Sequence, residues 1–340
     1  MTEHEHNNMQ MWRRLKVSLL RRGVLKTVIL IILTLMIVYV YNHPDNSSTE
    51  VIETQADVNG QQLMEDFSTS RSRRSQVLDE ACRHKAKGSV ENLAKTQFDH
   101  IIVNDKYKTL FCYVPKVACS QWKKVFLMMS GKVNDSRKLD EYTVHTVYSH
   151  FLRYLSSYQP NEILHKIKHY KKFIMVRNPL ERLVSAFQNK FHGTGQKNYK
   201  FVEIGMQIVR KYRKDFTEPV TGRDVTFEEF ASYVIDNPEG VRDEHWRSIV
   251  NLCSPCQVGY DFIAKQETLM EDANHIMSQM APHIAFPAKP KVYMKSNTSE
   301  SISYYLSQLP PSQVHKLLDI YKDDFSHFDY SFSKYVKDIF

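Results

Sequence analysis

One turn constrains this chain more than any other feature. An apolar stretch from Thr109 to Val114 runs directly into a helical pattern through the segment Pro115–Gln121, which contains Lys116 and Ser120. Backbone N–H groups at the start of a helix, with a cation beside them, bind anions such as phosphate or sulfate. The Walker spacing G-x-x-x-x-G-K-[ST] is absent, so the turn predicts a different kind of anion-binding junction.

A second junction of the same kind follows about sixty residues later. The apolar run Lys172–Arg177 leads through Asn178-Pro179 into a helical pattern over Leu180–Phe191. We expect Arg177 and Ser185 to reach one anion near the carboxyl edge of a sheet, where ligands of open α/β sheets usually bind. Two such junctions predict a nucleotide that carries two separated phosphate groups.

The order of the elements predicts the fold class. Strands alternate with helices, which favours an α/β fold with a central, mainly parallel sheet flanked by helices. Later elements are expected at Tyr260–Ala264 (strand), Glu267–Met280 (helix) and Pro310–Phe325 (helix). The chain has only 10 glycines and no G-x-G-x-x-G, which argues against a dinucleotide fold of the Rossmann kind.

The N-terminal segment predicts a single membrane anchor. An apolar run at 24–41 follows a cluster of arginines and lysines, so residues 1–23 are expected in the cytosol, and no cleavage site for a signal peptide follows the run. The first 41 residues hold six of the 46 lysines and arginines and two of the 38 acids, which is half of the net charge of +8. The remainder is too weakly basic to favour a nucleic-acid partner.

The polar segment 42–80 is expected to be a lumenal stem ahead of a folded domain at 81–340. Within the stem, Arg71-Ser-Arg-Arg74 resembles a proprotein-convertase site, and a solvated basic patch is the alternative that we favour.

Cysteines and sequons fit a lumenal domain. Five cysteines leave at least one thiol free if two disulfides form. Cys253-Ser-Pro-Cys256 lacks the further ligands of a zinc site, so no metal is expected, and a tight disulfide or two structural thiols is favoured. Asn46, Asn134 and Asn297 head glycosylation sequons.

Three ordered motifs carry a family resemblance. Val114–Lys123, Val176–Phe187 and the segment Asp243–Ile263 together resemble the Golgi carbohydrate sulfotransferases, in the branch of the chondroitin and dermatan 4-O-sulfotransferases and the HNK-1 sulfotransferase. The resemblance spans Cys82 to the C-terminus and implies a P-loop-like sulfotransferase fold. This chain departs from the usual family residues at Ser120-Gln121, commonly Thr-Asn, and at Asn178, commonly acidic.

The resemblance also implies a donor and its site. In this family the first motif holds the 5′-phosphosulfate of PAPS (3′-phosphoadenylyl sulfate) and the second holds its 3′-phosphate. Carried over, the first loop comprises Pro115, Lys116, Val117, Ala118, Cys119, Ser120 and Gln121. The second comprises Arg177, Asn178, Pro179, Leu180, Glu181, Arg182, Leu183, Val184 and Ser185.

The chemistry assigns expected roles within these loops. Lys116 is expected to neutralise the leaving oxygen, and Arg177 to grip the 3′-phosphate as a bidentate fork. Arg182 is expected either to do the same or to form a salt bridge across its helix. Lys123 and Lys124 are expected to face solvent.

A general base must accept the proton of the acceptor hydroxyl. His145 and His245 are the two candidates, each with a structural role as the alternative, and Glu181 is a third candidate that suits a helix N-terminus.

The expected partners are a glycosaminoglycan or glycoprotein glycan, the Golgi membrane and, as a further candidate, a second copy of the chain. Contacts to the glycan are expected from cations: Lys190, His192, Lys197, Arg247 and the run 210–214, although a charge run is more often a solvated helix face. The expected acceptor is the 4-hydroxyl of N-acetylgalactosamine in chondroitin or dermatan, and an HNK-1-type glucuronic acid 3-O-position is the alternative. A Golgi glycosyltransferase is less consistent, because no Asp-x-Asp occurs. A lumenal glycan-binding protein without activity would not need the paired junctions.

Overall fold

The computed structural model describes residues 32, 34–38, 46–83, 89–192, 198–287 and 298–333. Contacts divide the chain into two units, 1–67 and 68–340, and helix α2 (Asn46–Arg83) begins in the first and ends in the second. Within the described residues, no helix combines the length and the apolar character that a membrane span needs. The predicted anchor at 24–41 lies largely outside the described residues.

Unit 68–340 is built on a five-stranded sheet in the order β3-β1-β2-β4-β5. The strands are β1 (Ile101–Asn104), β2 (Thr109–Cys112), β3 (Arg153–Tyr154), β4 (Lys171–Val176) and β5 (Phe262–Lys265). Strands β2, β4 and β5 are parallel, whereas β1 pairs antiparallel with both β2 and β3. The predicted α/β class is therefore confirmed, and the sheet is mixed: two of its four pairings are parallel, and among the five strands β1 alone runs opposite to the others, because a short hairpin at 105–108 turns the chain back between β1 and β2.

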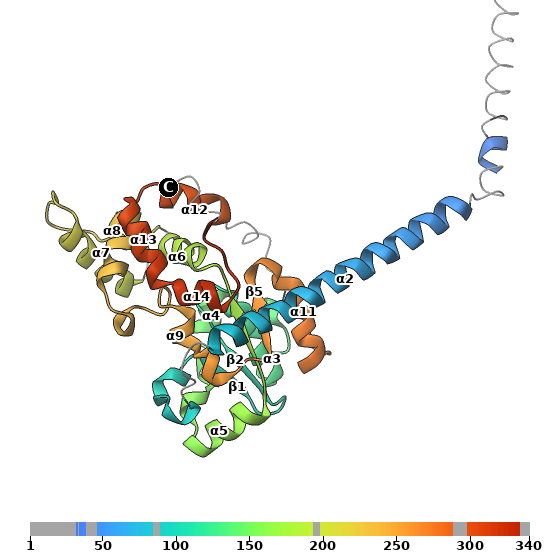
Figure 1. Cartoon of the computed structure of the whole chain (residues 1–340), viewed down its shortest axis with the longest axis horizontal. Coiled ribbons are helices and arrows are strands. Elements are labelled where there is room, and N and C mark those ends of the chain that lie inside the picture. The colour runs from blue at the N-terminus through green and yellow to red at the C-terminus, as the bar shows by residue number, and fades with distance from the viewer. Residues whose placement is uncertain are drawn as a thin grey trace, which may run out of the picture. The chain divides into compact units, whose positions relative to one another are not determined.

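Helices surround this sheet (Figure 1). In chain order, the helices that follow β2 are α3 (Cys119–Met129), α4 (Glu141–His145), α5 (Pro160–His169), α6 (Pro179–Phe187), α7 (Tyr199–Tyr212) and α8 (Phe227–Asp236). They are followed by α9 (Ile249–Cys253), α10 (Pro255–Val258), α11 (Leu269–Met280), α12 (Thr298–Leu306), α13 (Pro311–Ile320) and α14 (Lys322–His327). Two predicted helices are interrupted: a π-helical turn at Gln188–His192 follows α6, and Tyr321 separates α13 from α14.

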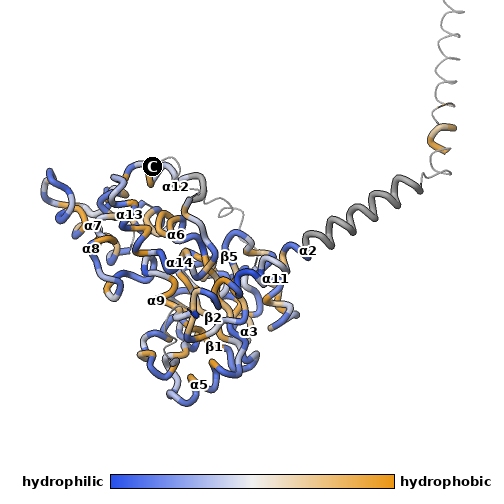
Figure 2. The backbone as a smooth tube through the Cα atoms, in the orientation of Figure 1, coloured by the Kyte–Doolittle hydropathy of each residue, from blue (hydrophilic) through white to orange (hydrophobic). Residues whose placement is uncertain are grey.

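The core consists of two apolar clusters. The first lies on the sheet, where Phe111 of β2 stacks on Phe173 of β4 at 4.7 Å between ring centroids and Trp122 of α3 packs against both. The second joins α6, α7, α8 and α13 around Phe187 and Trp246. Every residue of α6 is buried, which fixes the helix that follows β4. Apolar residues concentrate along β1, β2 and α6 in Figure 2.

Two disulfides join distant parts of the chain. Cys82 pairs with Cys256 and Cys112 pairs with Cys253, so Cys119 is the free thiol that the odd cysteine count predicted. The expectation of a tight Cys253–Cys256 disulfide or two thiols is wrong. Ser254 adopts the left-handed conformation between α9 and α10, and the two cysteines on either side of it reach different partners.

The end of α2 packs within unit 68–340. Leu78 and Cys82 are buried, and the guanidinium of Arg74 donates to Asp272 at 2.6 Å and to the carbonyl of Ile263 at 3.1 Å. Residues 68–80, expected to be part of a solvated stem, are therefore helical and in part buried.

Candidate active site

The turn between β2 and α3 has an unusual backbone. Lys116 (φ 71°) and Ala118 (φ 49°) both adopt the left-handed conformation, which is costly for residues other than glycine and concentrates at functional sites. Ala118 stands at the N-cap position of α3 and supplies no side-chain hydrogen bond to the helix. The start of α3 thus presents its N–H groups beside Lys116, as the sequence predicted for an anion site.

The second junction lies beside the first because β2 and β4 are adjacent and parallel. Arg177, at the end of β4, is buried and donates from Nη1 to the carbonyl oxygen of Lys116 at 3.4 Å. Its Nε lies 3.6 Å from a carboxylate oxygen of Glu181, one turn into α6. The two expected loops therefore meet at one edge of the sheet.

The remaining residues of the second loop serve α6 itself. The side chain of Asn178 caps the helix by accepting hydrogen bonds from the N–H groups of Leu180 and Glu181, at 3.1 and 3.3 Å. Glu181 is buried in the first turn, the position that the helix dipole favours for an acid. The others are buried as well: Pro179, Leu180, Leu183, Val184 and Ser185.

Arg182 does not form the expected salt bridge across its helix among the described residues. Its guanidinium donates to three carbonyl oxygens, those of Pro115 (3.0 Å), Glu244 (2.6 Å) and Arg247 (2.6 Å). The side chain is only 1% exposed. The predicted salt bridge is therefore wrong: Arg182 joins the first turn to the segment 243–247, and its contact with the 3′-phosphate stays a prediction.

Lys116 and Lys190 form a cationic pair at the first turn. Burial, and next the charge of Lys190, lower the pKa of Lys116 to about 8. Burial likewise lowers the pKa of Lys190, which comes from the π-helical turn after α6. Two desolvated cations beside a helix start would gain from an anionic ligand, because the ligand would offset both the desolvation and the mutual repulsion.

His145, the last residue of α4, lies beside the start of α3. Its Nε2 is 2.9 Å from Oγ of Ser120, and its Nδ1 is 3.4 Å from Nζ of Lys123. Burial, and then the charge of Lys123, lower the pKa of His145 to about 4. The expectation that Lys123 faces solvent is wrong: it is 6% exposed, and Nζ lies 4.1 Å from the ring centroid of Tyr113. A start of α3 at Cys119 places Lys123 four residues on, on the inward face.

His245 is held by a carboxylate. Its Nδ1 lies 2.6 Å from Oδ1 of Asp243, whose Oδ2 lies 2.6 Å from Nζ of Lys200. Burial lowers the pKa of His245, and the hydrogen bond to Asp243 acts in the opposite direction. Glu244, between them in sequence, accepts a hydrogen bond from the hydroxyl of Tyr113 at 3.3 Å. The charges of His245, Glu244 and Lys190 all act on His145, so the structure brings both candidate histidines to one site.

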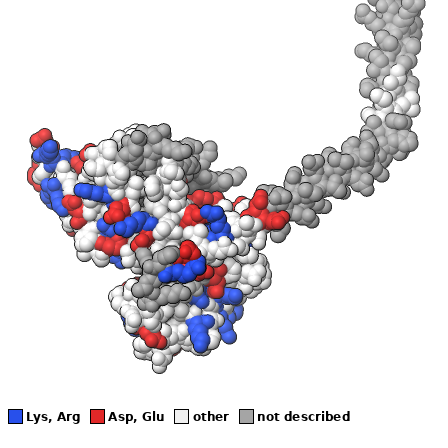
Figure 3. Space-filling model, in the orientation of Figure 1, with Lys and Arg blue, Asp and Glu red and all other residues white. Residues whose placement is uncertain are grey.

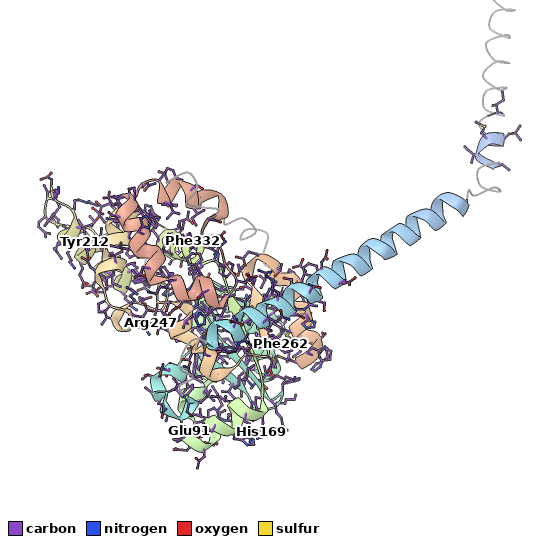
Figure 4. All side chains as sticks on the ribbon, viewed as in Figure 1. Glu91, His169, Tyr212, Arg247, Phe262 and Phe332 are labelled. Atoms are coloured by element: carbon purple, nitrogen blue, oxygen red, sulfur yellow. A yellow bond between two sulfur atoms is a disulfide. The ribbon has the colours of Figure 1, made fainter. Side chains whose placement is uncertain are left out.

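Most cations expected to bind the acceptor are occupied within the protein. Arg210 pairs with Glu218, Lys211 with Asp236, and Arg213 with Asp224 and Glu229, so opposite charges alternate over α7 and α8 (Figure 3). The ring of His192 contacts the carbonyl of Val225. Arg247, which is labelled in Figure 4, donates to the carbonyl of Arg242. Lys197 lies outside the described residues. Lys190 lies near Lys116 at the first turn.

The three sequons differ in what the structure describes. Asn134 is exposed in the loop after α3, as a glycan acceptor must be. Asn46 is the first residue of α2, its side chain undescribed, and Asn297 lies outside the described residues. Glycosylation at all three stays a prediction.

Sequence reasoning missed Lys123, the role of Asp243 and the contribution of Lys200. Helical periodicity could have predicted that Lys123 lies at the site, because it follows Cys119 by four residues and Ser120 by three and so shares their face of the helix. Asp243 stands two residues before His245, a spacing that suits a local hydrogen bond. Nothing local indicates Lys200, which reaches Asp243 from α7, 43 residues earlier.

Two strand-to-helix junctions converge on one cation-rich edge of a mixed sheet, and such an edge of an α/β protein offers positions for two anionic groups. A profile described as "Sulfotransferase family" matches residues 99–331, and the chain belongs to that family. It is 41% identical to carbohydrate sulfotransferase 14 of Danio rerio over 69% of this chain and 63% of that protein. It is 37% identical to carbohydrate sulfotransferase 11 of Rattus norvegicus, over 78% of this chain and 77% of the relative. Carbohydrate sulfotransferase 8 of Homo sapiens is 35% identical, over 77% of this chain and 63% of that protein. No solved structure matches the chain.

Proposed function

We propose that this protein transfers a sulfuryl group from PAPS to a hydroxyl of a glycan. The observation that carries the proposal is the contact between the two junctions: Arg177, at the end of β4, donates to the carbonyl of Lys116 in the turn after β2. One edge of the sheet therefore offers two anion-binding positions. Membership of the sulfotransferase family, and relatives named as carbohydrate sulfotransferases, support the same reaction.

The residues present fit the donor. Lys116, the start of α3 and Lys190 would hold the 5′-phosphosulfate, whose transferable sulfuryl group is the chemistry that PAPS supplies. Arg177 and Ser185 would hold the 3′-phosphate from the second junction. Arg182, in the helix after the second junction, would fix the distance between the two junctions by its hydrogen bond to the carbonyl of Pro115 in the first. The phosphosulfate end of the donor is anionic and would offset the desolvation that lowers the pKa values of Lys116 and Lys190.

The chain's own residues would act mainly by positioning and charge. Lys116 would stabilise the negative charge that develops on the leaving phosphate oxygen in an in-line displacement. A neutral imidazole would take the proton of the acceptor hydroxyl. His145 and His245 both lie at this site and are the candidates for that base.

For the acceptor, we propose the 4-hydroxyl of N-acetylgalactosamine in chondroitin or dermatan, following the resemblance of the three motifs. An HNK-1-type glucuronic acid 3-O-position is the alternative. We also propose that the protein acts in the Golgi lumen, anchored as a type II membrane protein by residues 24–41. Two disulfides suit such an oxidising compartment.

The experiment is a transfer assay with the detergent-purified full chain. Labelled sulfate from PAPS is offered to desulfated chondroitin, desulfated dermatan and an HNK-1-type glycan, and the modified hydroxyl is located by mass spectrometry. We expect label at the 4-position of N-acetylgalactosamine. Label in the HNK-1-type glycan alone would replace the acceptor assignment. No transfer to any of the three, from protein that binds adenosine 3′,5′-bisphosphate, would contradict the proposed reaction.

A further inference from the structure

The two histidines of the site are held in different ways. Both ring nitrogens of His145 have neighbours: Ser120 Oγ at Nε2 and the ammonium of Lys123 at Nδ1. An ammonium has no acceptor, so Lys123 must donate to Nδ1, and the proton of a neutral ring then resides on Nε2. In that tautomer Nε2–H donates to Oγ of Ser120, so His145 presents no free lone pair to an acceptor hydroxyl.

His245 has the opposite arrangement. A carboxylate only accepts, so the contact of 2.6 Å between Nδ1 and Asp243 places the ring proton on Nδ1. Nε2 then carries the lone pair, and no described residue forms a hydrogen bond with it. The ring packs edge-on against Phe201 at 5.6 Å and is 16% exposed, so its orientation is fixed while one part remains accessible.

Asp243 is itself fixed by two further contacts. It accepts from the backbone N–H of His245 at 3.0 Å and from Lys200 at 2.6 Å, and its side chain is 7% exposed. Trp246 is buried, and Arg182 binds the carbonyls of Glu244 and Arg247, so the segment that carries the pair is held at both ends.

We propose that Asp243 is a positioning residue that makes His245, rather than His145, the general base toward the acceptor hydroxyl. This inference rests on the proposed sulfuryl transfer. Nε2 of His245 takes the proton of the hydroxyl as the acceptor oxygen forms its bond to sulfur. The bond between sulfur and the bridging oxygen of the donor breaks, and that oxygen keeps the electron pair, beside Lys116. The imidazolium then returns its proton to water.

The charges around His245 set the expected pH behaviour. Asp243 and Glu244 raise its pKa, whereas Lys190, from the π-helical turn, lowers it. His145 and Lys200 complete the charged groups of this neighbourhood. Removing the carboxylate of Asp243 should therefore move the acid limb of kcat/KM to lower pH. It should also lower kcat, because an amide can turn its NH2 toward Nδ1 and move the ring proton to Nε2.

The test compares five variants of the full chain with desulfated chondroitin, or whichever acceptor the transfer assay identifies. For Asp243→Asn we expect kcat to fall on the order of 100- to 10,000-fold with the KM for PAPS unchanged. His245→Gln should lose the acid limb, whereas His145→Gln should keep it. Lys200→Met should reduce kcat by less than Asp243→Asn. Asp236→Asn is the matched control, because Asp236 also pairs with a lysine and a hydroxyl but touches no histidine among the described contacts.

Binding of adenosine 3′,5′-bisphosphate, followed by thermal shift, verifies that each variant folds. As a second measurement, added imidazole should restore transfer by His245→Ala and not by His145→Ala. Wild-type kcat in Asp243→Asn, or imidazole rescue of His145→Ala alone, would overturn the inference. Either result requires active wild-type protein, so the proposed function would stand.

Discussion

Arg182 in α6 donates from Nε to the carbonyl oxygen of Pro115, 3.0 Å away, across 67 positions of sequence. The same guanidinium binds the carbonyls of Glu244 and Arg247. One buried side chain thereby joins the first turn, the helix after the second turn and the segment that carries His245. The site is thus organised around a cation that donates hydrogen bonds to three backbone carbonyls.

Substituting Arg182 should therefore destabilise the protein and distort the site together. Arg182→Ala leaves one buried and two partly buried carbonyls without their donor, at about 1–3 kcal/mol for a buried group and less for the others, so we expect a loss of about 3 kcal/mol in the free energy of unfolding. Urea unfolding followed by tryptophan fluorescence measures it. Arg210→Ala is the control, because the pair with Glu218 is exposed, and it should have no measurable effect. Equal stability of both variants would show that the three hydrogen bonds contribute little.

Lys116 should impose an alkaline limit on transfer. Its pKa is lowered to about 8, so the free protein loses this cation as the pH rises through 8, and kcat/KM should fall above that pH. Lys116→Ala should lower kcat about 100- to 1,000-fold, the usual effect of removing one group that stabilises a developing charge. Lys116→Arg keeps the charge and should remove the limit.

Lys124→Ala is the matched control for Lys116, since Lys124 is the neighbour of Lys123 on the more exposed side of α3. Initial rates of transfer by the wild type and these variants, measured from pH 6 to 9.5, test whether Lys116 sets the alkaline limit. An alkaline limit that persists in Lys116→Arg would assign it to another group.

The two junctions were predictable because they depend on local pattern. An apolar run followed by Lys116, or by Asn178-Pro179, fixes where a strand ends and a helix begins, and the structure agrees within a few residues. Convergence of the junctions followed from the rule that ligands bind at the carboxyl edge of parallel strands. That rule applied because β2 and β4 are the parallel part of the sheet.

The rest depends on contacts between distant residues. Each cysteine of Cys253-Ser-Pro-Cys256 pairs more than 140 positions away, at Cys112 and Cys82, and spacing holds no information on such a choice. From the motif alone, Arg182 is interpreted as a ligand-binding arginine, because nothing in the local sequence indicates that three carbonyls surround it. The antiparallel pairing of β1 follows from a hairpin whose turn has no strong glycine signal.

Asp324 should make stability depend on pH. It is fully buried and accepts from the N–H groups of Ile249 and Val250, and burial raises its pKa to about 7. The folded state therefore binds a proton that the unfolded state releases above about pH 4, so this contribution to stability falls as pH rises from about 4 to 7. Three pKa units correspond to about 4 kcal/mol at most.

The measurement is the difference in unfolding free energy between the wild type and Asp324→Asn at pH 5 and pH 7.5. The difference isolates Asp324 from His145, whose lowered pKa acts in the opposite direction. We expect the wild type to lose stability relative to the variant as pH rises. A difference that does not change with pH would mean that Asp324 stays ionised throughout.

Cys119 should be the one thiol that reacts in the native protein. Cys82–Cys256 and Cys112–Cys253 consume the other four, and Cys119 is only partly buried. Alkylation without reductant, followed by peptide mass spectrometry, should label Cys119 alone. Replacing Cys112 and Cys253 by alanine should cost about 2–5 kcal/mol of stability, since their bond closes a long loop. Label on Cys253 or Cys256 in the untreated protein would contradict the pairing.

The convertase-like segment Arg71–Arg74 should resist cleavage in the folded protein. A protease needs an extended strand, whereas these residues lie in α2; Arg74 is 3% exposed and pairs with Asp272, and Arg73 pairs with Asp329. Incubation of the native full chain with a proprotein convertase should leave it intact, and cleavage should follow thermal unfolding.

Arg74→Ala removes the recognised residue but leaves Asp272 buried without its cation, at a cost of about 3–5 kcal/mol. Arg73→Ala, on the exposed side of the helix, is its stability control. A fragment that starts at Ser75, produced from the native protein at the rate of the unfolded one, would show that this end of α2 opens readily.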